Sequence, residues 1–482
     1  MNRTRTAYDV TRHSAGLLAA AMALGLALVA ACGDDDRHGT PPDVLTTPDG
    51  VLRDVQGRQI LLRGINARVA GLFDVTFDDG RVALEPIPPF DAEDCRFLAE
   101  ELGYNHLRLP VSWSGLEPER GTYDEDYLRR ILDVADTCGD YGIYTLVDLH
   151  QDAFSKHIGE DGAPLWAIVP PPTELLEGPL HDLNERRTSG QVLAAFESLF
   201  ANEEAVQDAY ADMAAWLASA LEGHPWVLGL ELMNEPVLFF DDAPLAAFHA
   251  HVGSVVREAA PTLTLFFEPN SLRNMTDDAP AEFPFPFDDA VYSPHIYTEV
   301  FLNGWESEDP TKIRDSVERA VQEAADHGAP LYVGEFGNDP KSDRGRLWIN
   351  ITLGLFDQHL ISSALWVYEE WSQGSWGLYE AQGEPNPGRL TVREEVVDLL
   401  ARAYPQAVDG RLMSFEYDAD ARTLTVQLTD AGDGEHLLAA PGRVYPAGVV
   451  AACDGVDVAT APGPGRVAVR CVGTTLTLGP AD

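Results

Sequence analysis

Two glutamates provide the strongest chemical signal in this sequence, because each one lies at the end of a short apolar run. Glu235 lies near the end of the run at 227–236, and Glu335 lies in the run at 331–336. Both runs are typical of buried parallel strands, so both carboxylates should leave their strands at the same end of one sheet. Glycoside cleavage needs two such facing groups: one protonates the leaving oxygen, while the other attacks the anomeric carbon or activates water.

The elements that would position these glutamates form a regular series. Short apolar runs alternate with longer amphipathic stretches, which is the pattern of repeated βα units. Eight runs can be counted, at 60–67, 106–113, 144–150, 227–236, 263–270, 290–297, 331–336 and 363–371. We therefore predict an α/β fold, a (β/α)8 TIM barrel, with its chemistry at the C-terminal ends of the strands. An open doubly wound sheet is disfavoured, because no glycine-rich phosphate fingerprint opens the first unit.

Other polar or aromatic residues occur at the same predicted strand ends. Taken alone, each has an ordinary explanation: an arginine can pair with a core acid, a histidine can be satisfied in the core, and a tryptophan can fill the barrel. Their recurrence at one end of at least five strands favours a site instead. The candidates are Arg108, His150, Asp152, Asn234, His295, Tyr297 and Trp366.

These residues give the chain a resemblance to a known family. The Asn-Glu-Pro at 234–236 closing the fourth run, and Glu335 closing the seventh, resemble the retaining β-glycosidases of glycoside hydrolase family 5. Five of the other candidates match the family's surrounding positions in order, so the resemblance covers about residues 60–404: Arg108, His150, His295, Tyr297 and Trp366. It implies that Glu235 is the acid/base and Glu335 the nucleophile, with no cofactor and no metal.

The assigned roles require particular environments. Glu235 must carry a proton when substrate arrives, so we expect its pKa to be raised by burial and by the charge of Glu335. Glu335 must stay ionised, with Arg108 and Tyr297 as expected donors. Asn234 is expected to bind the sugar 2-hydroxyl. Trp366 would offer its ring face to the sugar.

Two further segments narrow the resemblance. Residues 148–156 and 159–166 look like the endoglycoceramidase-related branch, whose members release glycans or single sugars from sphingolipids or sterols. A β-sandwich after the barrel is also typical of that branch. One position departs from the pattern: glycosphingolipid-cleaving members tend to carry a lysine soon after the first strand, where this chain has Arg68. The predicted function is a retaining hydrolysis of the bond between a glycan and a lipid aglycone, with a glycolipid or oligosaccharide as substrate.

Three alternatives stay open at this point. An endo-β-glucanase or mannanase would use the same barrel and the same glutamates. A surface lipoprotein that binds glycans without cleaving them is disfavoured, because a binder has no need of two intact catalytic carboxylates. A metallohydrolase built on His150, Asp152 and His295 is the weakest idea, since these residues lack helix-borne ligand spacing.

The apolar residues after Glu235 suggest where a lipid would bind. The acid/base protonates the leaving group, so the following loop, 237–240, should border the aglycone side of the cleft. That loop contains Phe239 and Phe240. The neighbouring run at 283–287, with three phenylalanines, is expected to extend the same apolar wall. The ordinary alternative is that these rings only pack the loops onto the barrel.

The N-terminus reads as an export signal. Arg3, Arg5 and Arg12 precede an apolar run at 17–31 that is too short to span a bilayer comfortably. Small residues directly before Cys32 resemble the lipobox of bacterial lipoproteins, so we expect a lipid anchor on Cys32, the alternative being an ordinary signal peptide. The protein would then be exported and tethered to a membrane of the cell envelope by an acidic segment that continues to residue 49.

Composition and cysteines set the remaining expectations. Removal of residues 1–31 takes away three arginines and one aspartate, so the formal net charge changes from −45 to −47. A chain this acidic will not seek nucleic acid or anionic lipid by electrostatics.

We expect a monomer with a signal peptide (1–31), a tether (32–49), a barrel (50–405) and a β-sandwich (406–482). Cys453 and Cys471 could pair, whereas Cys95 and Cys138 should lie too far apart on successive parallel helices.

Overall fold

A computed structural model describes residues 44–46, 50–237, 242–277, 285–287, 289–370, 376–380, 391–432 and 434–481. The predicted export signal, Cys32, most of the tether and the phenylalanines at 239, 240 and 283 lie outside these ranges. None of the helices in the described ranges combines the length and apolar character that crossing a membrane requires.

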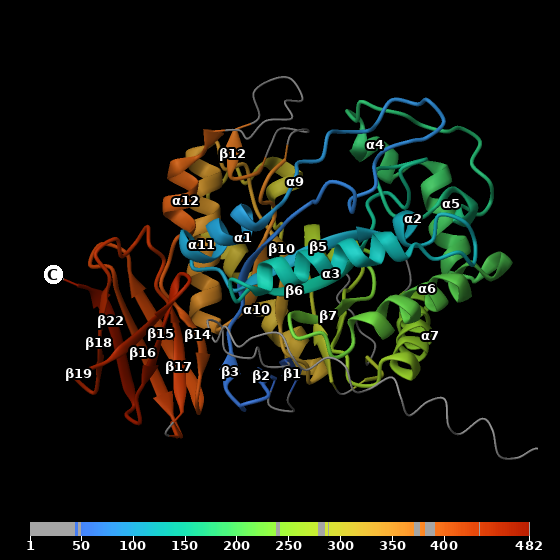
Figure 1. Cartoon of the computed structure of the whole chain (residues 1–482). Helices are drawn as coiled ribbons and strands as arrows, with labels where there is room; N and C mark the ends of the chain where they lie inside the picture. Colours follow the sequence, from blue (N-terminus) through green and yellow to red (C-terminus); the bar gives the residue numbers. More distant parts are fainter. Residues whose placement is uncertain are drawn as a thin grey trace, which may run out of the picture. The chain divides into compact units, whose positions relative to one another are not determined.

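Eight parallel strands form the barrel, as the sequence predicted (Figure 1). The hydrogen-bonded order is β10-β11-β4-β5-β6-β7-β8-β9, and parallel bridges from Tyr292 to Leu331 and from Ile296 to Phe336 join the two edge strands. The strands are β4 (Arg63–Asn66), β5 (His106–Ser112), β6 (Tyr144–His150), β7 (Val227–Glu231), β8 (Leu265–Phe267), β9 (Ala290–Tyr292), β10 (Tyr332–Phe336) and β11 (Ser362–Leu365).

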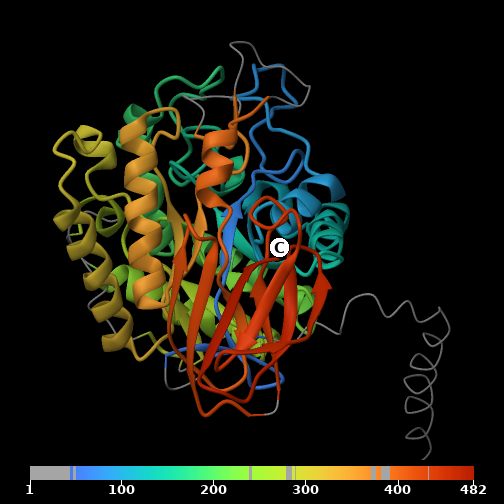
Figure 2. The ribbon, with the colours of Figure 1, turned by 90° about the vertical axis from the view of Figure 1, so that its left-hand side faces the viewer.

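Helices follow the strands and cover the outside of the barrel (Figures 1 and 2). The longer ones are α1 (Ala92–Glu100), α3 (Glu125–Gly139), α5 (Gly190–Phe200), α6 (Val206–Leu221), α7 (Ala243–Ala259), α10 (Pro310–His327), α11 (Asp343–His359) and α12 (Glu394–Leu400). Short helices near the strand ends are α2 (Trp113–Leu116), α4 (Leu183–Arg187), α8 (Ser271–Thr276) and α9 (Val300–Asn303), with 3-10 turns η1 (Leu165–Ala167) and η2 (Glu203–Ala205).

Helix α3 illustrates how the sequence specifies these helices. The side chain of Asp124 caps the helix by accepting hydrogen bonds from the backbone N–H groups of residues 126 and 127. Tyr127, Leu128, Ile131 and Ala135 recur at helical spacing and are buried, while charged residues occupy the other face. Burial of this stripe against the barrel strands holds the helix in place.

The C-terminal region forms two antiparallel sheets, and the predicted sandwich is confirmed. One sheet has the order β15-β16-β22-β18-β19, and the other β1-β2-β3-β14-β17-β21-β20. Their strands are β1 (Val44–Thr46), β2 (Leu52–Asp54), β3 (Gln59–Ile60), β14 (Pro405–Val408), β15 (Arg411–Asp418), β16 (Thr423–Thr429), β17 (Glu435–Ala439), β18 (Val449–Cys453), β19 (Val456–Val458), β20 (Thr460–Gly463), β21 (Arg466–Arg470) and β22 (Thr475–Pro480). A separate hairpin pairs β12 (Tyr379–Glu380) with β13 (Thr391–Val392).

The segment before the barrel contributes strands to this region. Ala407 of β14 lies opposite Ile60 of β3, so the chain enters the C-terminal sheet before it forms the first barrel strand. Figure 2 shows these blue strands beside the red C-terminal ones. The sandwich therefore connects to the barrel through both ends of the barrel sequence.

Both cysteine pairs form disulfides. Cys453 and Cys471 join the two C-terminal sheets, as the sequence allowed. Cys95 and Cys138 also pair, with Cα atoms 5.0 Å apart, so the expectation that they lie too far apart was wrong. The error lay in assuming that α1 and α3 begin at the same level. Cys95 lies in the first turn of α1 and Cys138 in the last turn of α3, so the disulfide places the start of the short α1 beside the end of α3.

Candidate active site

A cleft of about 630 Å³ lies at the C-terminal ends of the barrel strands. Every predicted site residue in the barrel except Arg108 and His295 lines it. Arg108 lies beneath its floor, bonded to Glu335, and His295 is bonded to Glu235. The structure therefore brings together residues that are up to 258 positions apart in the chain, between Arg108 and Trp366. The lining members are His150, Asp152, Asn234, Glu235, Tyr297, Glu335 and Trp366.

Glu335 is held by two donors at the end of β10. Arg108 Nη1 lies 2.7 Å from Glu335 Oε1, and the Tyr297 hydroxyl donates to Oε2 at 2.8 Å. The Glu335 side chain is only 7% exposed. Each carboxylate oxygen therefore has its own donor, and the two donors together fix the orientation of the carboxylate.

Arg108 is fully buried at the centre of a cage of acids. Its Nε donates to Glu231 at 2.6 Å, and its Nη2 donates to Asn234 Oδ1 at 2.9 Å. Burial opposes the charge on Arg108, but four carboxylates outweigh it and raise the pKa of the guanidinium well above its ordinary value: Asp148, Glu231, Glu335 and Glu268. A guanidinium in this cage is a permanent cation beneath the cleft.

Glu235 has a different environment beyond the end of β7. Its backbone has a φ of 39°, in the left-handed region that non-glycine residues seldom occupy. His295 Nδ1 lies 2.8 Å from Glu235 Oε1, and Asn274 Nδ2 donates to the same oxygen at 3.3 Å. The Glu235 side chain is 24% exposed, so it faces the cleft more openly than Glu335 does.

His295 lies between the two glutamates. Its Nδ1 is also 3.5 Å from Glu335 Oε2, and ligand atoms of the three residues all lie within 4.8 Å of one another. Gly334 leaves room for the ring, because a Cβ there would lie 2.9 Å from His295 Nε2. Retaining glycosidases have carboxyl groups about 5–5.5 Å apart, against roughly 6.5–9.5 Å in inverting ones. One carboxylate oxygen of Glu235 lies within 4.8 Å of one of Glu335, which is closer than the inverting range.

A family model described as cellulase, glycosyl hydrolase family 5, matches residues 76–372. The chain belongs to glycosyl hydrolase family 5. It is therefore a glycoside hydrolase that acts on O-glycosyl bonds, and a retaining mechanism is typical of this family.

Individual relatives agree with the family assignment. The chain is 28% identical to "Endoglycoceramidase I" of Rhodococcus hoagii (strain 103S), across 90% of this chain and 87% of the relative. It is 32% identical to "Ergosteryl-beta-glucosidase" of Saccharomyces cerevisiae, but over only 27% of this chain and 19% of that protein. Among solved structures, "Crystal structure of endogalactoceramidase" superposes with a TM-score of 0.75 at 27% identity, covering 91% of this chain and 99% of that one.

The charge state of Glu235 differs from the sequence expectation. Burial raises the pKa of this carboxyl, but the hydrogen bond and the positive charge of His295 outweigh burial and lower it to about 2. Arg187 and His150 act in the same direction. The prediction of a raised pKa was wrong for the substrate-free site, because it counted the charge of Glu335 and omitted the imidazolium between the two acids.

In this glycosidase, the cluster of Glu235, His295 and Glu335 is also the one group of three, within the described ranges, whose spacing suits a metal ion. The histidine does not fit that role. Its two ring nitrogens lie 2.8 and 3.3 Å from carboxylate oxygens. Burial opposes the charged ring, but Glu268, Glu335 and Glu235 raise its pKa well above the ordinary value, which favours a proton on each nitrogen. A protonated ring nitrogen has no lone pair for a metal.

His150 and Trp366 form one side of the floor of the cleft. Their rings stack at a centroid distance of 5.6 Å and an interplanar angle of 8°. His150 Nδ1 lies 2.5 Å from Asp148 Oδ2; although burial lowers the pKa of His150, this aspartate and Asp161 raise it to about 9. Asp152 instead forms a two-point ion pair with Arg187 at the rim. These contacts separate His150, Asp152 and His295 into different pairs, which does not support a metal site made of the three.

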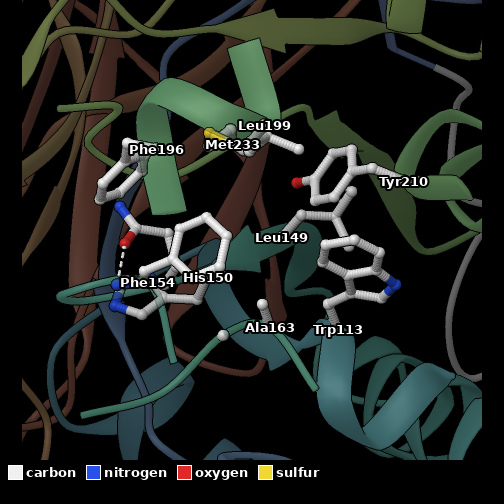
Figure 3. A pocket seen from close by; sticks show the side chains of 11 residues that line it. Trp113, Leu149, His150, Phe154, Ala163, Phe196, Leu199, Tyr210 and Met233 are labelled. Carbon is white, nitrogen blue, oxygen red and sulfur yellow. Dashed lines mark hydrogen bonds between the residues drawn. The ribbon is translucent and has the colours of Figure 1, made fainter. Parts of the chain in front are cut away.

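Mostly apolar side chains surround a small cavity beside His150 at the end of β6 (Figure 3). The rings of Phe154, Phe196, Tyr210 and Trp113 surround a cavity of about 20 Å³ next to His150. A space this small holds one water at most, so it is packing and not a substrate pocket.

The run at 283–287 does not extend the cleft wall in its described part. Phe285 stacks on Phe267 of β8 with ring centroids 3.8 Å apart and touches His249 of α7. Phe287 packs against Gly253 of the same helix. The hypothesis that these two rings receive a lipid was wrong, and the ordinary alternative of packing holds for them.

Sequence reasoning missed several residues that complete the site. Asp148, Glu231 and Glu268 surround Arg108, and Asn274 reaches Glu235. Glu268 carried a usable signal, because it closes an apolar run in Phe-Phe-Glu-Pro just as Glu235 follows its own run in Asn-Glu-Pro. Asp148 and Glu231 are acids inside predicted buried strands, which calls for a buried cation nearby.

Proposed function

We propose that this glycosidase cleaves the β-linkage between a glycan and a lipid aglycone, with Glu335 as nucleophile and Glu235 as acid/base. The observation that carries this proposal is the composition of the cleft. The lining residues that follow β4, β6 and β11 include several charged side chains, and those that follow β7, β8 and β9 include several apolar ones; Glu235 follows β7, and Glu335 lies in β10. A glycolipid has the same division at the bond to be cleaved.

The polar side lies over β4, β6 and β11. The side chains of Arg68, Asp152, Glu160, Arg187 and Glu370 line it. Arg68 is itself buried: it pairs with Glu85, and its Nη2 lies 3.8 Å from Glu370 Oε1, so it places a positive charge among the acids of this side. This side would bind the glycan, with the arginine in the region where related enzymes tend to carry a lysine.

The apolar side lies over β7, β8 and β9, next to the acid/base. Val237 follows Glu235 closely in the chain, and Leu272 and Met275 come from α8. Phe301 of α9 is 50% exposed and stacks on Trp376, with ring centroids 5.6 Å apart and planes at 7°. An exposed aromatic pair at a cleft is unusual without a partner, and burial of each ring would contribute about 1.5–3 kcal/mol.

Chemistry would proceed in two steps. Glu335 attacks the anomeric carbon while the leaving oxygen takes the acid/base proton, and the aglycone departs. Glu235 then removes a proton from water, which attacks the glycosyl ester and restores Glu335. Asn234 Nδ2 donates one hydrogen to the backbone carbonyl of Gln151 and has a second for the sugar 2-hydroxyl. Trp366 would support the sugar ring from below.

Two experiments test this function. Thin-layer analysis of products from glycosylceramides, steryl glucosides and β-glucans should show release from the lipid substrates; activity on β-glucans alone would favour the polysaccharide alternative. The second experiment is the substitution Phe301→Ser. It should weaken turnover of the lipid-linked substrate about tenfold, corresponding to ~1.4 kcal/mol, and spare a small chromogenic glycoside.

A matched control separates binding from stability. Leu347→Ser changes a similarly exposed apolar side chain on α11, outside the cleft, and should leave both substrates unaffected. An equal loss on both substrates with Phe301→Ser would contradict the lipid role. The prediction that Phe239→Ser and Phe240→Ser act like Phe301→Ser stands on sequence alone, since both positions lie outside the described residues.

We also propose that Cys32 is lipidated and tethers the enzyme to a membrane. The support is the signal-like sequence before Cys32 and the acidic segment after it. One acyl chain binds marginally, so several are expected for stable anchoring. Palmitate labelling should be lost in Cys32→Ser, and equal labelling of both forms would contradict the proposal.

A further inference from the structure

Glu268 lies behind the acid/base and outside the cleft. It follows β8, its side chain is fully buried, and it contacts three parts of the site. Its Oε2 accepts a hydrogen bond from the backbone N–H of Glu235 at 3.2 Å. Its Oε1 lies 3.3 Å from His295 Nε2 and 3.4 Å from Arg108 Nη2. No other described carboxylate touches both the backbone of Glu235 and the histidine that its side chain binds.

These contacts place three titratable groups in a line. Glu268 faces Nε2 of His295, and Nδ1 of the same ring faces Glu235 Oε1 at 2.8 Å. The Nδ1 contact is a hydrogen bond and holds one proton, on the ring or on Glu235; Nε2 is buried without a hydrogen-bond partner among the described residues, and Glu268 Oε1 at 3.3 Å is the carboxylate that can share its proton. The imidazole ring cannot give up both of its nitrogen-bound protons, because the loss of both would leave an imidazolate anion. A proton can therefore reside on Glu235 only while the other resides on Nε2.

We propose that Glu268 is a positioning residue for the acid/base, which fixes the orientation of His295 and keeps the proton that Glu235 uses within the line. This inference rests on the proposed function of Glu235. Glu268 never touches the substrate and acts through His295 and through the backbone of Glu235.

The proton balance of the reaction follows from this arrangement. In the first step the bond from the anomeric carbon to the leaving oxygen breaks, and the oxygen keeps the electron pair. The oxygen takes a proton from Glu235, which has received that proton from His295 Nδ1. The new bond joins the anomeric carbon to Glu335, which loses its charge. One proton stays between Glu268 and Nε2. In the second step the oxygen of the attacking water bonds to the anomeric carbon, and the bond from that carbon to Glu335 breaks and returns its electron pair to the Glu335 carboxylate. Glu235 takes the proton that the water loses, and the line holds two protons again.

The charged groups around the line support a shared proton. Burial raises the pKa of Glu268, and although His295 opposes that rise, the pKa reaches about 8. Glu231 from β7 raises it further, and Arg108 from β5 lowers it. From α7, His249 Nε2 lies 3.0 Å from the backbone carbonyl of Glu268, and burial lowers the pKa of this histidine to about 4.

The remaining groups face His295. Glu335 from β10 approaches Nδ1 at 3.5 Å, and Arg273 from α8 lies 3.3 Å from the His295 carbonyl oxygen. Arg273 is itself paired with Glu323 at 2.9 Å. The carboxylates of Glu235, Glu268 and Glu335 together favour the charged ring.

The backbone contact has a separate consequence. Glu235 holds a left-handed conformation, and its N–H is directed to Glu268 Oε2. Glutamine at 268 can still accept this hydrogen bond but has no charge to stabilise the imidazolium. Alanine can do neither, so the two substitutions separate the two contributions.

The test compares Glu268→Gln with wild type on aryl β-glycosides from 2,4-dinitrophenyl to phenyl, with a sugar that the wild type cleaves. We expect kcat/KM for the phenyl glycoside to fall about tenfold more than for the dinitrophenyl glycoside. Loss of one carboxylate lowers the pKa of His295, so the alkaline limb of the pH profile should move down by about one pH unit or more. Glu117→Gln is the control: it changes a buried glutamate that accepts from Trp113 Nε1, away from the line, and should leave both readouts unchanged.

A readout independent of turnover completes the test. In protein labelled with 15N-histidine, the signal that disappears in His295→Gln should show both ring nitrogens protonated at pH 7, and Glu268→Gln should lower the pH at which that ring loses its proton. A neutral His295 at pH 7 in wild type would overturn the inference, as would equal losses for all leaving groups with an unchanged titration. Failure of the wild type to cleave any glycoside would instead refute the proposed function and leave the titration result standing.

Discussion

The ends of β7 and β10 present two glutamates to the same cleft in opposite ways. Glu335 lies within β10 and receives hydrogen bonds from Arg108 and Tyr297, neither of which changes its charge near neutral pH. Glu235 lies on a strained backbone and is bonded to His295, which can exchange a proton with it. We call the surroundings of Glu335 the fixed corner, because its two donors keep their charge state. We call the surroundings of Glu235 the variable corner, because His295 allows the charge there to change. A nucleophile and an acid/base have these two requirements.

The largest expected effect removes the fixed corner. Glu335→Ala should lower turnover by at least about 10⁴-fold, because no other described carboxylate is placed to attack the anomeric carbon. Azide should restore activity by entering the space left by the side chain and should yield an inverted glycosyl azide. Product analysis by NMR checks the stereochemistry, and a retained product would assign the nucleophile elsewhere.

Removal of the variable corner should depend on the leaving group. Glu235→Ala should lower turnover of a substrate with a poor leaving group by about 10²–10⁴-fold, the usual contribution of general acid catalysis. A dinitrophenyl glycoside needs little protonation, so its first step should be nearly unaffected. Burst kinetics on both substrates measures this difference. Equal losses would indicate that Glu235 only shapes the site.

The Tyr297 hydroxyl tests how the fixed corner is maintained. Tyr297→Phe removes one of the two donors to Glu335, and a hydrogen bond to a charged group contributes about 1.5–3 kcal/mol, so turnover should fall roughly 10–100-fold. Burial raises the pKa of Tyr297 well above its ordinary value, and the loss should therefore be the same from pH 5 to pH 8. Tyr292→Phe is a matched control: its hydroxyl donates to Glu323 at 2.8 Å outside the cleft, so stability should fall while turnover persists.

The difference between the two corners also shows what the sequence could and could not predict. The strand pattern placed Glu235, Glu335, Arg108, His295 and Tyr297 at one end of one barrel, because parallel strands expose their C-terminal ends together. It could not give the pKa of Glu235, since that value depends on which side chain lies within 3 Å of it. The side chain is His295, which is 60 positions away in the chain.

Two other predictions were wrong because the sequence does not show where a helix begins along the barrel or which surface an aromatic ring packs against. The pairing of Cys95 with Cys138 depends on where α1 begins along the barrel, and helical periodicity carries no such information. Phe285 and Phe287 looked like cleft residues from their place in the chain, but they pack against β8 and α7. Glu268 could have been predicted from the sequence, because a carboxylate that closes an apolar run is the same signal that identified Glu235.

The smallest expected effect concerns stability in acid and isolates the variable corner. The pKa of Glu235 is about 2 in the folded protein against an ordinary 4.5, so its ionised form stabilises the fold fully above about pH 4.5. This contribution is lost as the pH falls toward 2, because the unfolded chain takes up the proton first. Glu235→Gln cannot titrate, and its free energy of unfolding should therefore decrease less than that of wild type between pH 5 and pH 3. With allowance for the partial exposure of the side chain, the difference should be on the order of 1 kcal/mol. Urea denaturation at pH 5, 4 and 3 measures it. Parallel decreases in the two proteins would mean that His295 does not hold Glu235 in its charged form, and the contrast between the two corners would then reduce to their different exposure.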